Sequence, residues 1–393
     1  MSNAVQLMQK SSRQSAENRS SLRVAALIAT SEISGPGRQL VALGRELQRR
    51  GAEFVIVALM RPGTPSAFTA FAREQGIECR EMTDRGPFDP KLVGEVRAFI
   101  REWRPDVVQT HSYKPTSVLY ILRKLGVPCA WIGFHEGATD KGFKDRLYTR
   151  LDFHMLRAAD RVVVMSQKQR QIFPPSFDRV HVVNNAVPEM PRARDASSVP
   201  PVLRRRRGQG PVPLVGAIGR LSREKGVDVF LDALALLKAR GVAVRGIVVG
   251  EGALEHELRE QARRLGLAGD VDFTGRVDAM LEAYEALDLM VIPSRSEGLP
   301  SALLEALQTG LPVVTTRVGA MIEIVGEEPR SMRMVATERP ELLADAIEAE
   351  LADIASPEAA AARARVASSY SIAKRCDHML QIYDEALSVR GLA

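Results

Sequence analysis

The chain has 393 residues, of which 45% are hydrophobic and 26% charged, and its formal net charge is +6 at neutral pH. This length predicts two or three globular domains, and the mild basic excess suits an anionic small molecule or an acidic membrane surface. It does not indicate a nucleic-acid partner, which would need aromatic or recognition-helix features that the sequence lacks.

Residues 1–21 are polar and lack the apolar core of a secretory signal, so we expect a disordered tail. No apolar run approaches the roughly 18–20 residues needed to cross a bilayer. Cys79, Cys129 and Cys376 are widely spaced without a CxxC motif, which argues against a disulfide framework or a zinc site. We therefore expect a cytoplasmic protein, free or attached peripherally to the inner face of the membrane.

Short apolar runs alternate with helical patterns over residues 22–188, the expected N-terminal domain. Buried strands are predicted at 22–30, 53–60, 105–111, 128–135 and 161–166, and an amphipathic helix at 38–51. Continuous apolar strands separated by helices predict a parallel, doubly wound sheet.

Residues 189–212 lack periodicity, are rich in proline and arginine, and are predicted to be a linker. Its run of four arginines at 204–207 is interpreted either as a solvated segment or as a phosphate-binding surface.

The alternation resumes in the expected C-terminal domain, residues 213–370, with strands at 214–219, 244–250, 271–275, 287–293 and 311–316. Residues 371–393 form one more amphipathic helix, which we expect to pack back on the N-terminal domain. The predicted fold is α/β, with two Rossmann-like doubly wound domains that face each other across a cleft and bind a ligand at the carboxyl ends of their strands.

The segment "GRLSREKGVD" (219–228) places Arg220 and Lys225 between a strand and a helix, where the helix N-terminus favours an anion. These side chains are interpreted as a diphosphate clamp or as two solvated charges. In "VVGEGALEHEL" (248–258), Gly250 begins a strand-to-helix turn that either admits a ligand close to the backbone or is simply tight.

The segment "VDFTGRVD" (271–278) ends a strand, and its backbone near Arg276 and Val277 could meet a nucleobase edge. Asp270 and Asp272 form an Asp-x-Asp pair of the kind that can hold a divalent metal. Asp270 precedes a strand and Asp272 lies at its start, and we do not expect the pair to hold a metal.

The segment "SRSEGLPSALLEALQTGLPVV" (294–314) carries Glu297 and Glu305 with seven residues between them. Pro300 suits the first turn of a helix, so the amides of Gly298 and Leu299 would be free to face an anion or a sugar oxygen. A carboxylate at Glu305 can accept both hydroxyls of a cis-diol such as ribose, and Glu297 would point to the more distal part of the same ligand. The alternative is that both acids are solvent-facing charges near a helix N-terminus.

Together, in this order and spacing, these four segments resemble the C-terminal half of glycosyltransferase family 4, a retaining family with the GT-B fold. The likeness extends over about residues 22–390 and is strongest over 212–326. It implies that Arg220 and Lys225 hold the diphosphate of a nucleotide-sugar, that Glu305 binds its ribose and that Glu297 contacts the donor sugar. It also implies contacts from Gly250, the amides of Gly298 and Leu299, and the backbone near Arg276 and Val277.

The N-terminal half is similar to the same family at several points. "SEISGPGRQLVALGREL" (31–47) resembles its first glycine-rich loop, with Gly35 and Gly37 in place of the usual Gly-Gly pair. "VVQTHSYKPTSVLYIL" (107–122) matches the stretch that supplies an active-site histidine, here His111, and His135 ends the following strand near a second one. The likeness thus assigns His111 with Glu297 to catalysis, and Gly35, Gly37 and His135 to substrate binding.

The expected function is retaining transfer of a sugar from a nucleotide-diphosphate sugar to an acceptor hydroxyl, in envelope polysaccharide or glycolipid synthesis. The donor is a substrate, and no cofactor or essential metal is expected. A saccharide or lipid-linked acceptor should contact the N-terminal domain, whose basic amphipathic segment 141–161 could lie on anionic lipid or simply face the core. The alternatives are a nucleotide-sugar 2-epimerase-like isomerase and a non-catalytic nucleotide-sugar-binding protein.

Overall fold

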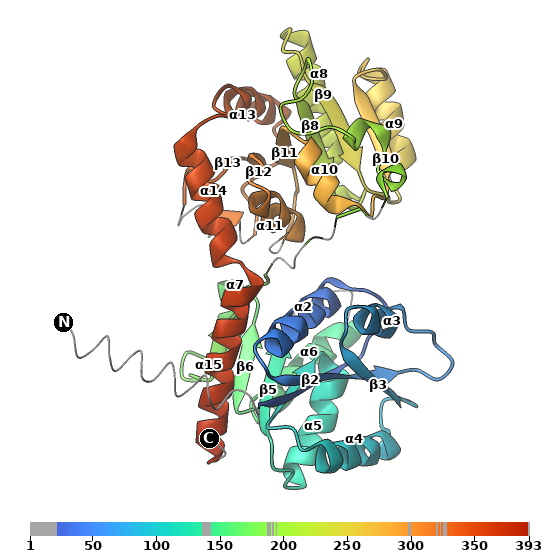
Figure 1. Cartoon of the computed structure of the whole chain (residues 1–393), viewed down its shortest axis with the longest axis vertical. Helices are drawn as coiled ribbons and strands as arrows, with labels where there is room; N and C mark the ends of the chain where they lie inside the picture. Colours follow the sequence, from blue (N-terminus) through green and yellow to red (C-terminus); the bar gives the residue numbers. More distant parts are fainter. Residues whose placement is uncertain are drawn as a thin grey trace, which may run out of the picture. The chain divides into compact units, whose positions relative to one another are not determined.

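A computed structural model describes residues 22–135, 143–186, 190, 192–193, 195–297, 300–319, 321–322, 324 and 328–391, without the side chains of 143–149, 168 and 196. The predicted tail, residues 1–21, lies outside the described residues. The chain divides into two compact units, one formed by Met1–Pro188 with Ile372–Ala393 and the other by Glu189–Ser371. Each unit is an α/β structure with its own parallel sheet (Figure 1).

The first unit contains a seven-stranded sheet in the order β3-β2-β1-β4-β5-β6-β7, and every pair of neighbouring strands is parallel. Its strands are β1 (Arg23–Ile28), β2 (Glu53–Met60), β3 (Glu78–Thr83), β4 (Val107–His111), β5 (Ala130–His135), β6 (Arg161–Val164) and β7 (Val180–Val182). Helices cover both faces, so alternate residues of β1 enter two different cores: Val24 and Ala26 on one side, Ala25 and Leu27 on the other.

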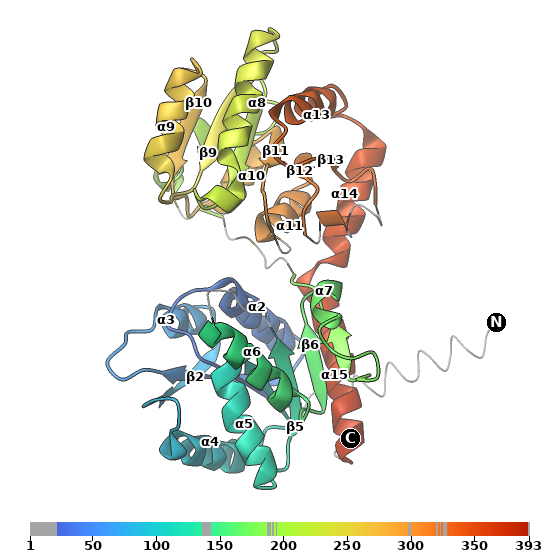
Figure 2. The ribbon, with the colours of Figure 1, turned by 180° about the vertical axis from the view of Figure 1, so that it is seen from behind.

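One face of this sheet is covered by α2 (Gly35–Arg49), α3 (Ala67–Glu74) and α15 (Ile372–Arg390), and the other by α4 (Pro90–Trp103), α5 (Tyr113–Lys124) and α6 (Phe143–Leu156). A short helix, α7 (Gln167–Arg170), follows β6. Figure 2 shows α5 and α6 from the side on which they lie in front of the strands. Helix α15, which comes last in the sequence, packs on α2 and β5 of the first unit.

The second unit contains a six-stranded parallel sheet in the order β10-β9-β8-β11-β12-β13. Its strands are β8 (Leu214–Ile218), β9 (Arg245–Val249), β10 (Val271–Gly275), β11 (Leu289–Ile292), β12 (Val313–Thr316) and β13 (Arg333–Val335). The two doubly wound sheets confirm the predicted fold class.

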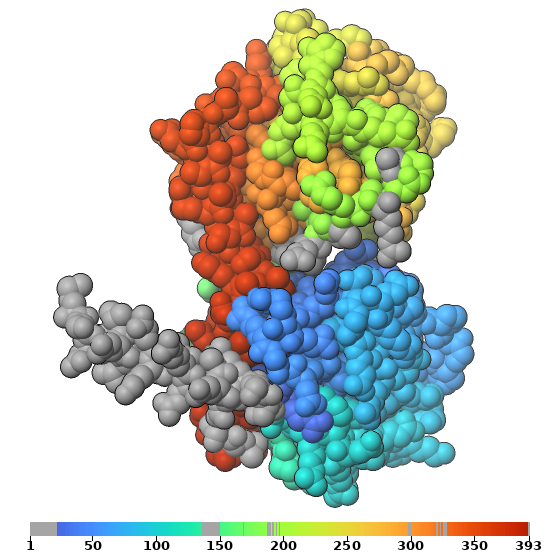
Figure 3. Space-filling model, viewed as in Figure 1, coloured from blue at the N-terminus to red at the C-terminus, as the bar shows by residue number. Residues whose placement is uncertain are grey.

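The helices of the second unit also lie on both faces of its sheet. One core contains side chains from α8 (Val227–Ala239), α9 (Glu255–Arg264) and α13 (Pro340–Ala352), and α11 (Ser301–Gln308) packs on β12 and α14 (Pro357–Ser369). Helix α10 (Met280–Ala286) and the short 3-10 turns η2 (Ala196–Ser198), η3 (Pro201–Leu203) and η4 (Arg223–Lys225) also belong to this unit. The red and orange-red atoms of α13 and α14 form one side of it in Figure 3.

Both sheets reverse their strand order at one point, between β1 and β4 in the first unit and between β8 and β11 in the second. Loops that leave the two strands at such a point turn to opposite faces and open a crevice at the carboxyl edge, where ligands of this fold class bind. In the first unit His111 ends β4 directly beside Ile28 of β1. In the second unit, Lys225 follows β8 and Glu297 follows β11.

Candidate active site

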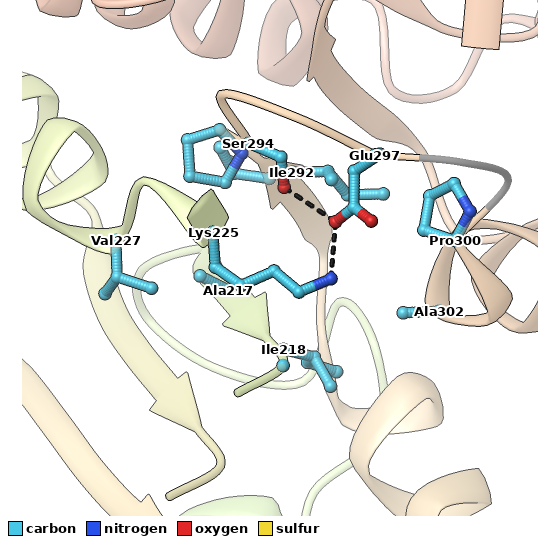
Figure 4. A pocket seen from close by; sticks show the side chains of 12 residues that line it. Ala217, Ile218, Lys225, Val227, Ile292, Ser294, Glu297, Pro300 and Ala302 are labelled. Atoms are coloured by element: carbon cyan, nitrogen blue, oxygen red, sulfur yellow. Dashed lines mark hydrogen bonds and ion pairs between the residues drawn. The ribbon is translucent and has the colours of Figure 1, made fainter. Parts of the chain in front are cut away.

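Lys225 and Glu297 meet at the carboxyl edge of the second sheet. The ammonium of Lys225 donates to Oε1 of Glu297 at 2.5 Å, and the hydroxyl of Ser294 donates to the same oxygen at 2.9 Å. The carboxylate is more enclosed than the amine, with 10% and 26% of the two side chains exposed. Figure 4 shows the three side chains pointing toward one another in a small pocket, whose lining includes residues at the ends of β8 and β11. The pair brings one positive and one negative group to a single point, which suits a ligand with both phosphates and hydroxyls.

Glu305 lies on α11, and the buried phenol of Tyr284 fixes the position of its carboxylate. The hydroxyl of Tyr284 donates to Oε2 of Glu305 at 2.7 Å, and Tyr284 itself is fully buried. Burial, together with the negative charge of Glu305, raises the pKa of this phenol well above its ordinary value, so it remains a donor. The glutamate is therefore oriented before any ligand binds.

Arg220 is exposed, and no hydrogen bond or ion pair joins its side chain to another described residue. Arg276 is also exposed, and among the described residues its guanidinium pairs with the neighbouring Asp278, at 3.1 Å. Val277 is 7% exposed, which leaves its backbone, rather than its side chain, to meet a ligand. Gly298 and Leu299 lie outside the described residues. The roles assigned to these five positions stay predictions.

Glycines bring the loops at this edge into direct backbone contact. A Cβ on Gly250 would lie 1.9 Å from the carbonyl oxygen of Gly219, and a Cβ on Gly226 would lie 2.1 Å from that of Pro293. Both glycines also have positive φ, of 136° and 65°. The loops after β8, β9 and β11 thus pack backbone to backbone, which by itself explains why Gly250 is glycine.

His111 is buried in the first unit, 3% exposed, and stacks on Phe134 with ring centroids 4.3 Å apart. Its Nε2 lies 3.2 Å from the side-chain oxygen of Gln109, whose amide in turn donates to the hydroxyl of Tyr383 on α15. The following residue, Ser112, has φ 77° and ψ 169°, a strained conformation for a residue with a side chain. Strain of this kind concentrates at functional sites, which favours the assignment of His111.

His135 ends β5 and is 5% exposed. Its Nδ1 donates to Oδ2 of Asp152 on α6 at 3.1 Å, and the ring of Phe153 lies 4.6 Å away. The carboxylate fixes the tautomer and orientation of the imidazole, as it does for histidines that bind or exchange protons through Nε2. Asp152 is also buried, and its other oxygen has no partner among the described residues.

Gly35 and Gly37 form the first turn of α2. The predicted helix 38–51 therefore begins earlier, because the side chain of Ser34 caps Gly37 at 3.2 Å and Pro36 suits a first turn. A Cβ on Gly37 would lie 2.8 Å from the ring of Phe68, whereas Gly35 is exposed with open space around it. Packing accounts for Gly37, and Gly35 is the one that leaves the helix N-terminus accessible.

The charged sequences outside the site have structural partners. Asp270 pairs with Lys238 at 2.7 Å and Asp272 with Arg245 at 2.8 Å. Within the arginine run, Arg205 pairs with Asp288 at 2.9 Å, and Arg207 donates to backbone carbonyls of the same unit, including that of Leu287. In the described part of the chain, no group of three or more His, Cys, Asp or Glu side chains is placed to hold a metal ion.

Sequence reasoning did not identify Ser294, Tyr284 or Asp152 as parts of the site. Ser294 lies inside the segment that was singled out, so its proximity to Glu297 could have marked it. Tyr284 and Asp152 are 21 and 17 residues from the side chains that they orient, and no local pattern links them.

The sequence comparisons match the two units separately. The family described as "Glycosyl transferase 4-like domain" matches residues 34–186, and "Glycosyl transferases group 1" matches residues 212–353. The chain belongs to the group 1 glycosyltransferases. This confirms the resemblance drawn from the segments around Lys225 and Glu297.

Curated relatives of this glycosyltransferase extend over different lengths. The lipopolysaccharide core biosynthesis mannosyltransferase LpsB of Rhizobium meliloti is 35% identical over 44% of the chain, a stretch that spans 52%, about half, of that relative. The GDP-mannose-dependent alpha-mannosyltransferase of Mycobacterium tuberculosis is 27% identical over 93% of the chain and 97% of its own length. The 2-deoxystreptamine N-acetyl-D-glucosaminyltransferase of Streptomyces fradiae is 28% identical over 76% of the chain and 78% of its own length.

Solved structures share the fold of this glycosyltransferase at low identity. Anabaena Alr3699/HepE in complex with UDP has a TM-score of 0.76 at 20% identity, over 92% of the chain and 100% of its own. A glycosyltransferase from Rickettsia africae has a TM-score of 0.73 at 18% identity, over 93% of the chain and 99% of its own. These neighbours support the GT-B fold.

Proposed function

We propose that this enzyme transfers a hexosyl group from a nucleoside-diphosphate sugar to an acceptor hydroxyl with retention of anomeric configuration, in envelope polysaccharide or glycolipid synthesis. The observation that carries the proposal is the Lys225–Glu297 pair at the point where the second sheet reverses its order. Such an edge is where a fold of this class binds nucleotides.

The relatives favour transfer over the alternatives. The curated ones named above are a mannosyltransferase, a second mannosyltransferase that uses GDP-mannose, and an N-acetylglucosaminyltransferase. Anabaena Alr3699/HepE has been solved with UDP and with UDP-glucose. None of these names describes an isomerase or a silent binding protein, so those two readings are not favoured.

In the proposed complex, Lys225 leaves Glu297 and binds the diphosphate together with Arg220, whose guanidinium is exposed and can fork onto phosphate oxygens. Glu297 then accepts hydroxyls of the donor sugar. Glu305, already oriented by Tyr284, accepts the ribose hydroxyls.

The remaining donor contacts are assigned to backbone groups. The amides of Gly298 and Leu299 would meet the sugar and the phosphates. The backbone beside Arg276 and Val277 would meet the base, and Gly250 would allow the loops to approach the ligand closely.

In the proposed reaction, the bond between the anomeric carbon and the diphosphate oxygen breaks, and the acceptor oxygen bonds to the same face of that carbon. The acceptor hydroxyl gives its proton to the departing phosphate. Negative charge grows on the leaving diphosphate, where Lys225 and Arg220 stabilise it electrostatically. His111 is assigned a role in positioning and polarising the sugar, with Glu297.

The first unit would contribute the acceptor side. His135, held by Asp152, is suited to hydrogen-bond a substrate oxygen, and Gly35 leaves the N-terminus of α2 open to an anion. We propose a saccharide or lipid-linked acceptor. Because cationic side chains can neutralise the leaving group, no essential metal or other cofactor is proposed, and activity should persist in excess EDTA.

We further propose a cytoplasmic location with peripheral attachment to an anionic membrane surface. No helix in the described part of the chain is long and apolar enough to cross a membrane. Residues 141–142 of the basic segment 141–161 lie outside the described residues, but in the rest of it Arg150, Leu151 and Arg157 are exposed. The test is sedimentation with acidic liposomes at low salt, where failure to bind would remove the membrane proposal.

The function is tested by nucleotide release from a panel of UDP-, GDP- and ADP-sugars, with and without candidate acceptors. Wild type should turn over at least one donor, and Glu297→Gln should lose most of that turnover. An absence of turnover with every donor and acceptor, or full turnover by Glu297→Gln, contradicts the assignment.

A further inference from the structure

Arg295 lies two residues before Glu297, and its side chain makes four hydrogen bonds to three residues. Its two terminal nitrogens grip the carboxylate of Asp228 at 2.8 and 2.7 Å, and one of them also donates to the carbonyl oxygen of Arg223 at 2.8 Å. Its Nε donates to Glu338 at 2.5 Å. We call these contacts the Arg295 brace.

The brace joins four segments around the donor site: the loop after β8, the first turn of α8, the loop after β11, and the turn before α13. The main chain adds one more link, from the amide of Arg295 to the carbonyl oxygen of Glu224 at 2.8 Å. Glu338, which accepts from Arg295, has φ 55°. This left-handed conformation is unusual for a residue with a side chain.

The ion pair within the brace is firm. Burial alone would raise the pKa of Asp228, but the hydrogen bonds and positive charge of Arg295 outweigh this and hold the pKa below its ordinary value. Bidentate Arg–carboxylate pairs combine energy with fixed geometry. With 21% of its side chain exposed, Arg295 is also better shielded than an ordinary surface arginine.

Arg295 has little capacity left to bind a ligand itself. A guanidinium has five N–H groups, and hydrogen bonds to Asp228, Arg223 and Glu338 use four of them. Its contribution is therefore to the positions of other groups.

We propose that Arg295 is a positioning residue. It holds the loop that carries Lys225 in a fixed position relative to the loop that carries Glu297 when a donor is bound. In the ligand-free state, the Lys225–Glu297 pair itself ties these loops together. A diphosphate that draws Lys225 away removes that tie, whereas the Arg295 brace is built from other residues and persists. The spacing between the phosphate-binding amine and the sugar-binding carboxylate is then set by the brace. This inference rests on the proposed function for its consequence in catalysis but not for its effect on the loops.

The test compares Arg295→Met with Arg240→Met, which removes an arginine paired with Asp345 at 2.7 Å on the surface of the same unit. The first readout is amide hydrogen exchange over residues 219–226 and 293–297 in protein that also carries Lys225→Met, so that the Lys225–Glu297 pair no longer ties the loops. Arg295→Met should accelerate exchange there by about tenfold or more without changing the core strands, and Arg240→Met should not. Asp228→Asn should reproduce the effect, and serves in place of Arg295→Met if that variant does not fold.

The second readout is steady-state kinetics with the donor that wild type turns over. Arg295→Met should raise the donor KM by about tenfold with a smaller change in kcat, and the double variant with Asp228→Asn should be little worse than either alone. Unchanged loop exchange, or equal acceleration in Arg240→Met, overturns the inference whatever the activity. Accelerated loop exchange in a protein whose wild type turns over no donor supports the brace and refutes the proposed function.

Discussion

Replacing Glu297 by glutamine should tighten the binding of a nucleoside diphosphate while greatly slowing transfer. In the free enzyme, Lys225 is committed to Glu297 at 2.5 Å, so a diphosphate must break that pair before it can use the ammonium. Glutamine keeps the size of the side chain and can still accept from Ser294, but it has no charge to hold the lysine or to repel phosphate.

The expected gain follows from the exposure of the pair. With 26% of Lys225 and 10% of Glu297 exposed, the net strength of the pair lies near the top of the surface range, at about 1 kcal/mol. That amount corresponds to about fivefold tighter binding of the diphosphate. Turnover of the nucleotide-sugar should fall by about a hundredfold or more, because the contact with the reacting sugar is lost.

The measurement is isothermal titration with UDP, GDP and ADP, using the one that binds wild type most tightly. Lys225→Met is the matched variant and should weaken the same nucleotide. If Glu297→Gln binds it no better than wild type does, or Lys225→Met binds it equally well, then Lys225 is not the diphosphate ligand and the reasoning fails.

Three further changes probe the supports of the site. Tyr284→Phe should raise the donor KM by about tenfold with a smaller effect on kcat, because Glu305 loses its orienting donor; an unchanged KM would show that the phenol is only structural. Gly250→Ala should lower the free energy of unfolding by about 3 kcal/mol or more, since its Cβ would meet a carbonyl oxygen at 1.9 Å. Gly266→Ala, at φ 70° with open space, should cost only about 1 kcal/mol in the same urea titration, and equal losses would contradict the packing argument. Because the pKa of Asp228 is lowered on folding, its stabilising contribution is present above about pH 4 and disappears as pH falls through the folded value. Asp228→Asn should flatten the acid limb of a stability–pH curve, and an unaltered limb would contradict the shift.

The two sheets could be predicted from the sequence because parallel strands buried on both faces are continuous apolar runs, as in residues 53–60. The start of α2 was placed three residues late, although Ser34 and Pro36 are ordinary signals of a helix N-terminus. Glu297 and Glu305 could be singled out because they are close in the chain, and the roles assigned to them stay predictions.

The residues that hold those groups in place could not be predicted from the sequence. Arg295 and Asp228 are 67 residues apart, and Gln109 and Tyr383 are 274 apart. Only the folded sheet brings such pairs together. The sequence around an arginine or a tyrosine does not indicate which distant residue it will contact. The same holds for Gly250, where the carbonyl oxygen of Gly219 in a neighbouring loop leaves no room for a side chain.

The path of the chain has a consequence for how the protein is made. The first unit is completed by α15, whose buried side chains, among them Cys376, Met379 and Tyr383, enter the core against α2. The whole second unit is therefore synthesised before the first can close its core. During translation the second unit can fold while the first still exposes an apolar face, which makes that face the natural target of chaperones. A chain that stops at residue 371 should keep a folded second unit and an aggregation-prone first one.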